Sequence, residues 1–273
     1  MARELPAPRW PDGADVAVSL TFDVDAESGW LGEGEEYAQR LTTLSEARYG
    51  VARGVPRILE LLEELSIPAT FYVPGDTAER HTEAVERIVA AGHEIGHHGY
   101  LHLRSDRVDA DRQRVEIERG LAALEATLSV RPTGYRSASW ELTPATFELL
   151  VEHGFDYDSS CMGDDRPYLE ELDGRTIVEL PVHWSLDDWP YFAWTIDHGG
   201  NVSNARDFEQ VWLDEFDSAL RDRRHITYTM HPEVIGRGYR IAALRRVVEQ
   251  MRERGNVWFA THRQVVERLK AAV

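Results

Sequence analysis

Short apolar runs alternate with amphipathic helical patterns along most of the chain, and this alternation restricts the possible folds most strongly. The strand-like runs are residues 15–25, 69–73, 93–98, 133–138, 156–161, 177–184, 225–231 and 257–260. Most of them are separated by segments whose apolar residues recur at i, i+3 and i+4, the spacing of a helix with one buried face. Strand–helix–strand units pair in parallel through right-handed crossovers. About seven or eight units therefore predict an α/β fold, with a (β/α) barrel favoured over an open sheet.

Capping and breaking residues mark where the helices should begin and end. Helical spacing begins near Val55, Thr77, Arg114, Thr143, Phe208 and Ile241. We expect Asp76 to cap the second helix, and Thr143 to cap the fourth because Pro144 follows at the first helical position. The other boundary signals are a capping box at Thr261 and Gln264, and helix ends with positive φ at Gly92 and Gly154.

No repeat, low-complexity segment or linker divides the sequence, so we expect residues 1–273 to form a single domain. Two long connections interrupt the alternation of strands and helices. The first runs from residue 26 to about residue 53 and carries three glycines around Trp30, whereas the second, from residue 162 to about 175, is polar. Long connections in a compact barrel are often functional, which makes the segment around Trp30 a candidate lid.

The charge and composition exclude several classes of partner. A net charge of −18 argues against nucleic acid, because phosphate backbones need a basic footprint, and it disfavours anionic membrane surfaces. No stretch approaches the roughly 18 uninterrupted apolar residues of a membrane-spanning helix. The N-terminus shows no signal-peptide pattern, so we expect a cytoplasmic location. Cys161 is the only cysteine, which excludes an internal disulfide.

Polar side chains gather at the carboxyl ends of the predicted strands, which is the edge where parallel α/β folds bind ligands. These residues are Asp23, Asp25, His98, His102, Arg136, Asp187, Asp188 and His231. Each is weak evidence alone, but their shared position along the strands indicates a catalytic face.

His98 and His102 are spaced so that both imidazoles can reach one ion, since residues four apart share one side of a helical turn. Asp23 and Asp25 point to the same face of their strand because side chains alternate there. One carboxylate can bind an ion while the other takes a proton from water. Two histidines and a carboxylate leave coordination positions open. This suits a hydrolytic metal ion, or the redox iron of an oxygenase, which the strand–helix alternation disfavours.

Five segments resemble, in order, the motifs of polysaccharide deacetylases with a NodB homology domain, carbohydrate esterase family 4. They are residues 21–27 (TFDVDAE), 97–102 (HHGYLH), 134–140 (GYRSASW), 185–192 (SLDDWPYF) and 229–232 (TMHP). The resemblance covers roughly residues 18–261 and implies a distorted (β/α) barrel of about seven strands. It further implies a hydrolase of non-peptide carbon–nitrogen bonds with one divalent ion, usually zinc, bound by Asp25, His98 and His102.

The same resemblance implies an acid–base pair. Asp23 would be the general base that takes a proton from water, and His231 the general acid that protonates the leaving nitrogen. Arg136 would orient Asp23 through a charged hydrogen bond. Either Asp187 or Asp188 would hold His231 in the required tautomer.

Aromatic residues near the predicted strand ends are the candidates for substrate contact. We assign this role to Trp30, Tyr100, Trp140 and Trp189. Aromatic faces stack on sugar rings or on small planar heterocycles, although ordinary packing in a core or between subunits is the alternative for each.

The motifs also depart from the common family pattern. The first has Asp-x-Asp instead of adjacent aspartates, and the second has Gly99 where Ser or Thr is usual. These variants are most similar to a subgroup containing the Helicobacter-type peptidoglycan deacetylase and allantoinase-like proteins. Allantoinase-like relatives have lost the metal ligands, whereas this sequence keeps all three.

We therefore expect N-deacetylation of an N-acetylated sugar or glycan. The alternative is hydrolysis of a small cyclic imide or ureide in the cytoplasm, which the absent signal and the lid-like insertion favour. A catalytically silent binding barrel is a third hypothesis, disfavoured because Asp23 and His231 are both present. The resemblance also implies a homo-oligomer, with a tetramer as the expected form.

Overall fold

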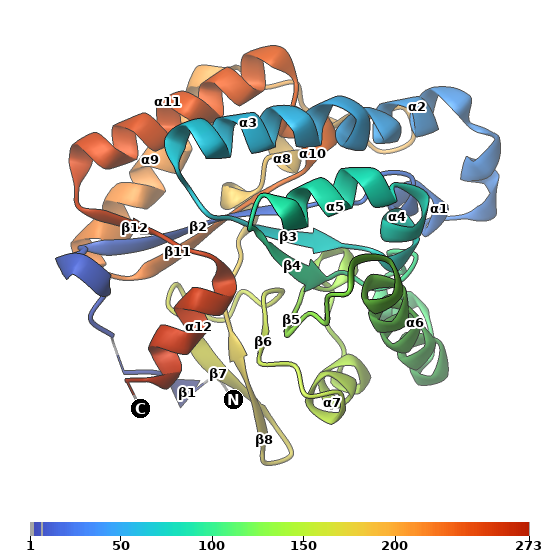
Figure 1. Ribbon diagram of the computed structural model, residues 1–273, viewed down its shortest axis with the longest axis horizontal. Helices are drawn as coiled ribbons and strands as arrows, with labels where there is room; N and C mark the ends of the chain where they lie inside the picture. The colour runs from blue at the N-terminus through green and yellow to red at the C-terminus, as the bar shows by residue number, and fades with distance from the viewer. Residues whose placement is uncertain (1–2, 7, 273) are drawn as a thin grey trace.

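A curled sheet of mainly parallel strands forms the centre of this protein, whose computed structural model describes residues 3–6 and 8–272 (Figure 1). The strands are β1 (Arg3–Glu4), β2 (Val16–Asp23), β3 (Thr70–Val73), β4 (Glu94–His97), β5 (Gly134–Tyr135), β6 (Tyr157–Asp158), β7 (Tyr168–Leu172), β8 (Arg175–Glu179), β9 (Trp194–Thr195), β10 (Gly199–Gly200), β11 (His225–Met230) and β12 (Val257–Phe259). The order β11-β2-β3-β4-β5-β6-β8 joins parallel neighbours throughout, and β12 pairs with β2 in parallel. The predicted α/β fold of the distorted-barrel type is therefore confirmed.

The seam of the barrel lies between β8 and β11. In the described part of the chain, one isolated parallel bridge between Asp187 and Thr229 joins the segment after β8 to β11. The N–H of Asp188 also donates to the carbonyl of Thr229 at 3.1 Å. The barrel is thus closed at its carboxyl edge only, at the point that brings this pair of aspartates beside His231.

The strands are shorter than the apolar runs that predicted them. β5 stops at Tyr135 because the chain then turns through Ser139 and Trp140, which both have positive φ. β8 ends at Glu179, two residues before Pro181, which has no N–H to donate to a ladder. The residues released from the strands form the loops of the carboxyl edge.

The polar connection predicted for residues 162–175 is wrong, because it contains a strand. β7 pairs with β8 in an antiparallel hairpin, and β1 pairs with β7. Asp173 and Gly174 form the turn and both have positive φ, as a two-residue hairpin loop requires. The Asp-Gly pair in the sequence is a signal of a hairpin turn. The strand β7 gives no matching signal, because it is partly exposed and lacks an apolar pattern.

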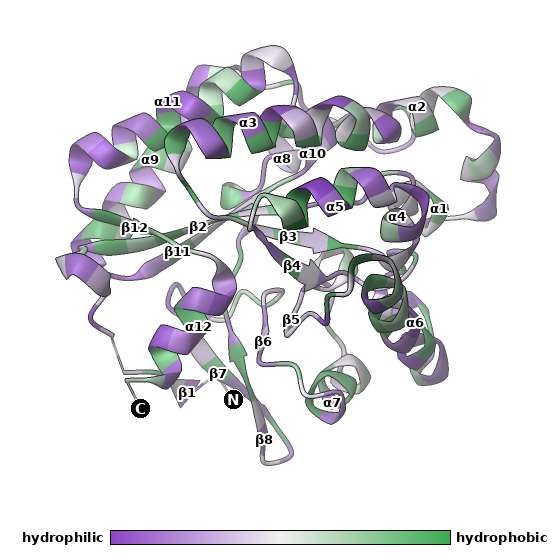
Figure 2. Ribbon diagram, viewed as in Figure 1, coloured by the Kyte–Doolittle hydropathy of each residue, from purple (hydrophilic) through white to green (hydrophobic). Residues whose placement is uncertain are grey.

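Helices surround the sheet, and Figure 1 shows α3, α9 and α11 together on one side of it. The bounds are α1 (Ser28–Leu31), α2 (Leu41–Tyr49), α3 (Val55–Leu65), α4 (Gly75–Arg80), α5 (Thr82–Ala90), α6 (Ala110–Leu128), α7 (Pro144–Glu152), α8 (Trp189–Phe192), α9 (Ala205–Asp222), α10 (Pro232–Ile235), α11 (Gly238–Arg254) and α12 (His262–Lys270). Figure 2 shows alternating hydrophilic and hydrophobic bands along them, as expected of helices that bury one face. The central strand β2 is buried along its whole length.

Most of the predicted helix boundaries are confirmed. Thr143 and Thr261 both form capping boxes, and the two predicted glycine helix ends have φ angles of 81° and 73°. The cap at Asp76 is wrong, because α4 begins one residue earlier at Gly75 with Pro74 as its N-cap. The helix predicted from residue 77 is also interrupted at His81, whose imidazole binds the carboxylate of Glu27 at 2.6 Å.

The connection predicted for residues 26–53 is largely helical. It contains α1 and α2, and the π-helical segment Gly50–Gly54 joins α2 to α3. α10 packs against this segment so closely that a Cβ atom on Gly54 would lie 2.2 Å from the carbonyl oxygen of Pro232. A Cβ on Gly236 would meet the same oxygen at 2.3 Å. These glycines set the position of α10, and therefore of His231 at its N-cap.

None of the helices in the described ranges has both the length and the apolar character needed to cross a membrane. The expected cytoplasmic location stays a prediction. The assignment of residues 1–273 to a single domain also stays a prediction, although one sheet joins strands from both ends of the described chain.

Gly54→Ala should lower stability and activity together, because its methyl group would push α10 away. Overpacking of this kind costs about 1–3 kcal/mol, which corresponds to several degrees in Tm. Gly238→Ala is the matched control, since nothing lies within 4 Å of a Cβ there and alanine is the better helix former. Thermal unfolding and a rate assay check both variants. Wild-type stability and rate in Gly54→Ala would show that the contact does not position α10.

Candidate active site

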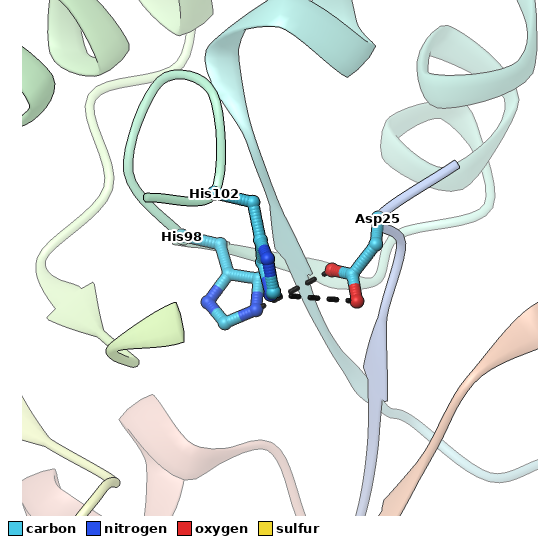
Figure 3. A group of neighbouring side chains, drawn as sticks. All are labelled: Asp25, His98 and His102. Carbon is cyan, nitrogen blue, oxygen red and sulfur yellow. Dashed lines mark ion pairs between the residues drawn. The ribbon is translucent and has the colours of Figure 1, made fainter. Parts of the chain in front are cut away.

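Asp25, His98 and His102 meet at the carboxyl edge of the sheet. Figure 3 shows both imidazoles pointing toward the carboxylate. His98 Nε2 lies 3.4 Å from Asp25 Oδ1, and His102 Nε2 lies 3.5 Å from Asp25 Oδ2. One ligand atom from each residue falls within 4.8 Å of the others. All three predicted ligands are therefore neighbours in space.

The loop that carries the two histidines is not the helical turn that their spacing suggested. Gly99 and His102 have φ angles of 74° and 56°, so the chain reverses between them. Glu116 on α6 accepts the N–H groups of Tyr100 and Leu101 at 3.1 and 2.7 Å. The positive φ at Gly99 gives a physical reason for glycine where the family pattern has Ser or Thr.

Helix α4 holds both halves of the cluster. The free N–H groups of its first turn, at Gly75 and Asp76, donate to the carbonyls of Gly99 and Tyr100 at 3.0 and 2.9 Å. The hydroxyl of Thr77 donates to the carbonyl of Asp25 at 2.7 Å. One short helix thus fixes the histidine loop and the aspartate against each other.

The donor set fits a divalent cation. The carbonyl of Arg136 can only accept, so His98 donates to it through Nδ1 at 2.7 Å, and its Nε2 faces the cluster. Asp25 Oδ1 and His102 Nδ1 are buried and have no hydrogen-bond partner among the described residues. Burial would raise the pKa of Asp25, but His102 and His98 outweigh it and hold that pKa well below its usual range. The carboxylate is therefore ionised, as a metal ligand must be.

Asp23 forms a buried ion pair beside the cluster. Its Oδ1 lies 2.7 Å from Nη1 of Arg136, and both side chains are almost fully buried. Arg136 also donates to Thr21 and Ser159, and its guanidinium lies 4.2 Å from the ring centre of Tyr72. Asp23 Oδ2 is 3.9 Å from Nε2 of His98. A carboxylate held in this way is fixed in orientation at the edge of the ligand cluster.

His231 also lies beside Asp25. Its Nδ1 donates to Asp188 at 2.8 Å, whereas Asp187 Oδ1 is 3.5 Å away and accepts the N–H of Trp189 instead. His231 Nε2 then faces Asp25 at 4.0 Å. Burial lowers the pKa of His231, but Asp187 and Asp188 outweigh it and raise that pKa well above its ordinary value. The imidazole can therefore hold a proton at neutral pH.

An aromatic cavity of about 370 Å³ encloses these groups. Its lining includes Trp30, Trp140 and Trp189, three of the four aromatic residues predicted to contact substrate. The rings of Trp140 and Trp184 lie 4.4 Å apart between centres, and Trp189 lies 5.1 Å from the ring of His231. A cavity of this size and composition is typical of small-molecule sites.

Tyr100 corrects the prediction for the fourth aromatic residue. Its side chain is buried outside the cavity, where its hydroxyl donates to Glu79 and accepts from Arg119, each at 2.7 Å. The reversal of the chain at Gly99 explains this orientation, and no pattern in the sequence indicated it.

Two functional features escaped the sequence analysis. Glu233 lines the cavity, and its position after the His-Pro pair was the available signal. Asp158 and Glu179 lie side by side in register on β6 and β8 and are fully buried. Burial raises the pKa of Asp158 to about 6 and that of Glu179 well above its usual range. Cys161 lies beside them.

Comparison with known proteins identifies the family. A family model described as "Polysaccharide deacetylase" matches residues 12–157, just over half of the chain. A solved structure from Mycobacterium smegmatis, named a "putative polysaccharide deacetylase", is 41% identical with a TM-score of 0.93 and covers 98% of this chain and 96% of its own. The chain belongs to the polysaccharide deacetylase family. It is accordingly a hydrolase of carbon–nitrogen bonds other than peptide bonds, as predicted.

Two further relatives represent the two activities that the sequence left open. The peptidoglycan deacetylase of Helicobacter pylori is 29% identical over 283 residues, which cover 93% of this chain and 96% of the relative. A solved structure of Puue allantoinase is 26% identical with a TM-score of 0.86 and covers 98% of this chain and 94% of its own. Both likenesses extend over nearly the whole length of each protein.

Asp188→Asn should move the alkaline limb of the pH–rate profile to lower pH. A histidine with a raised pKa stays protonated at neutral pH and loses its proton only as the pH rises through that value. Without the Asp188 charge the pKa of His231 falls, so the acid form is lost earlier, and the rate at pH 8 should drop about 10- to 100-fold. Asp187→Asn is the control. Asp187 should give the smaller shift, because its Oδ1 lies 3.5 Å from Nδ1 of His231 and accepts the N–H of Trp189 instead. If Asp187→Asn moves the alkaline limb further than Asp188→Asn does, Asp187 is the residue that supports His231.

Proposed function

We propose that this protein is a metal-dependent deacetylase of N-acetylated sugars or glycans. One observation carries the proposal. Three ligand-type side chains meet in one cavity, and a buried Asp23–Arg136 pair and a His231–Asp188 pair both lie beside them. Hydrolysis of an amide needs a base for the water and an acid for the leaving nitrogen, and this geometry offers one of each.

Asp25, His98 and His102 would hold the ion, which we propose to be a single zinc. Two imidazole nitrogens and one carboxylate oxygen are the ligands of many catalytic zinc sites. When bound, the ion supplies a Lewis acid that polarises the acyl carbonyl and lowers the pKa of water. Asp25 is ionised, and the bond from Nδ1 of His98 to the carbonyl of Arg136 leaves Nε2 as the nitrogen that would bind the ion.

The acid and base roles follow from the hydrogen bonds. Asp23 takes a proton from the attacking water through Oδ2, since Arg136 occupies Oδ1. His231 gives the proton on Nε2 to the leaving nitrogen, while Asp188 keeps Nδ1–H in place and stabilises the imidazolium. The guanidinium of Arg136 acts on Asp23 by fixing its orientation and its charge.

The choice of substrate rests on the aromatic cavity and on the relatives. Trp30, Trp140 and Trp189 offer faces on which a sugar ring can stack. The Helicobacter pylori relative is named a peptidoglycan deacetylase, which supports an acetylated glycan. The second candidate is hydrolysis of a cyclic imide or ureide, which the likeness to Puue allantoinase and the limited cavity favour. A homo-oligomer and a cytoplasmic location remain part of the proposal.

Two aspartate variants separate metal binding from catalysis. Asp25→Ala should lose most of its bound metal because it removes the carboxylate ligand. Asp23→Asn should keep its metal, because its amide oxygen still accepts from Arg136, but lose at least about 100-fold in turnover. Metal analysis after dialysis and a rate assay measure both effects. If both variants keep metal and rate, the assignment of the two aspartates is wrong.

A hydrolysis panel tests the substrate class directly. Metal-loaded and chelated enzyme should be compared on N-acetylglucosamine oligomers, succinimide, hydantoin and allantoin. We expect release of acetate from the oligomers, loss of that activity after chelation, and recovery when zinc is returned. Turnover of the cyclic compounds alone would favour the second candidate. Full activity after chelation would contradict the metal mechanism for either class.

A further inference from the structure

Glu233 is a buried carboxyl group in the wall of the active-site cavity, and the steps assigned above do not use it. It is the second residue of α10, two positions after His231, and only 7% of it is exposed. Its side chain lines the same cavity as Asp25 and Trp189. Its Oε2 is buried and has no hydrogen-bond partner among the described residues.

The carboxyl group of Glu233 packs against a segment of the chain that offers it no hydrogen-bond partner. The π-helical segment Gly50–Gly54 forms the wall there, and a Cβ on Gly50 would lie 2.8 Å from Oε2 of Glu233. Gly50 has no side chain that could accept or donate a hydrogen bond. π-helical turns of this kind occur often at functional sites.

Two other buried glutamates of the described chain, Glu116 and Glu179, also leave one oxygen without a hydrogen-bond partner, but neither lines this cavity. The remaining examples have side-chain partners. Glu94 accepts from Thr70 and Tyr157, and Glu209 pairs with Arg246. A buried carboxyl oxygen without a hydrogen-bond partner lowers the stability of the folded protein. Burial and the nearby charge of Asp25 also raise the pKa of Glu233 to about 8. A cost of this kind is often retained because a functional site uses the group.

We propose that Glu233 is a substrate-contacting residue that hydrogen-bonds a hydroxyl group of the sugar during deacetylation. A hydroxyl both donates and accepts, so it can satisfy this carboxyl group in either protonation state. An N–H group only donates, so it would leave the O–H of a protonated carboxyl group without an acceptor. The assignment rests on the proposed deacetylase function, and it makes Glu233 a determinant of selection for hydroxylated substrates over cyclic imides.

The first test asks whether Glu233 and one hydroxyl group of the sugar contribute to the same interaction. Wild type, Glu233→Gln and Glu233→Ala are assayed on an N-acetylglucosamine oligomer and on its 3-deoxy, 4-deoxy and 6-deoxy analogues. Glu233→Ala should lower kcat/KM for the oligomer about 10- to 100-fold, with a smaller loss in Glu233→Gln. For one deoxy analogue, the kcat/KM of wild type should fall by a similar factor. The kcat/KM of Glu233→Ala should fall almost no further with that analogue. If every missing hydroxyl lowers kcat/KM by the same factor in wild type and in Glu233→Ala, the assignment is overturned.

The second test separates contact with substrate from a structural role. Because Oε2 is unpaired, Glu233→Gln should keep its metal and unfold at the wild-type temperature or above it. Glu209→Gln is the matched control, since Glu209 is equally buried but ion-paired and lies outside the cavity. It should lose stability and keep its kinetics. A lower Tm with unchanged kcat/KM in Glu233→Gln would show a structural role and overturn the proposal.

Failure of the substrate class is distinguishable from failure of the residue. Wild type that deacetylates the oligomer but shows no coupling to Glu233 overturns this inference alone. Wild type that hydrolyses no acetylated sugar overturns the proposed function and the hydroxyl contact with it. Any turnover of succinimide should be unaffected by Glu233→Ala, and an equal loss on both substrate classes would also contradict selection by a hydroxyl.

Discussion

The buried guanidinium of Arg136 is the interaction on which the rest of the site depends. It pairs with Asp23 at the end of β2, donates to Ser159 just after β6, and lies over the ring of Tyr72 on β3. Its own carbonyl accepts from His98. One residue therefore sets the orientation of the proposed base and the tautomer of a proposed ligand. Removing either partner of such a pair leaves an uncompensated buried charge, at a cost of about 3–5 kcal/mol.

A second constraint sets the position of the proposed acid. His231 caps α10, and α10 rests on the glycines of the π-helical segment Gly50–Gly54. The seam of the barrel brings Asp188 to the same point through its bond to Thr229. The two sides of the site are therefore built from segments far apart in sequence, which converge because parallel strands end at one edge of the sheet.

Much of the fold and the ligand set could be predicted, because their signals are local. Strand runs, helical spacing and caps depend on neighbouring residues, and strand ends group Asp23, Asp25 and Arg136 on one edge. Predictions that needed a long-range contact or a special backbone angle did less well. Tyr100 turns away from the cavity because Gly99 adopts a positive φ. Glu233 enters the cavity because α10 packs on glycines almost two hundred residues earlier in the chain, for which periodicity gives no signal.

The buried acidic groups also separate into two kinds. Burial raises the pKa values of Asp158 and Glu179 beside Cys161, whereas the two imidazoles that face Asp25 hold its pKa well below the usual range. Both clusters bring ligand-type atoms together, but only the second lies in the aromatic cavity with an acid and a base.

X-ray absorption at the zinc edge of zinc-loaded protein tests the central claim most directly, because it reports the atoms bound to the ion. An ion held by Asp25, His98 and His102 should show only nitrogen and oxygen neighbours at about 2.0–2.2 Å, with the outer-shell scattering of two imidazoles. A sulfur neighbour at about 2.3 Å would place the ion at Cys161 with Asp158 and Glu179 and would contradict the account.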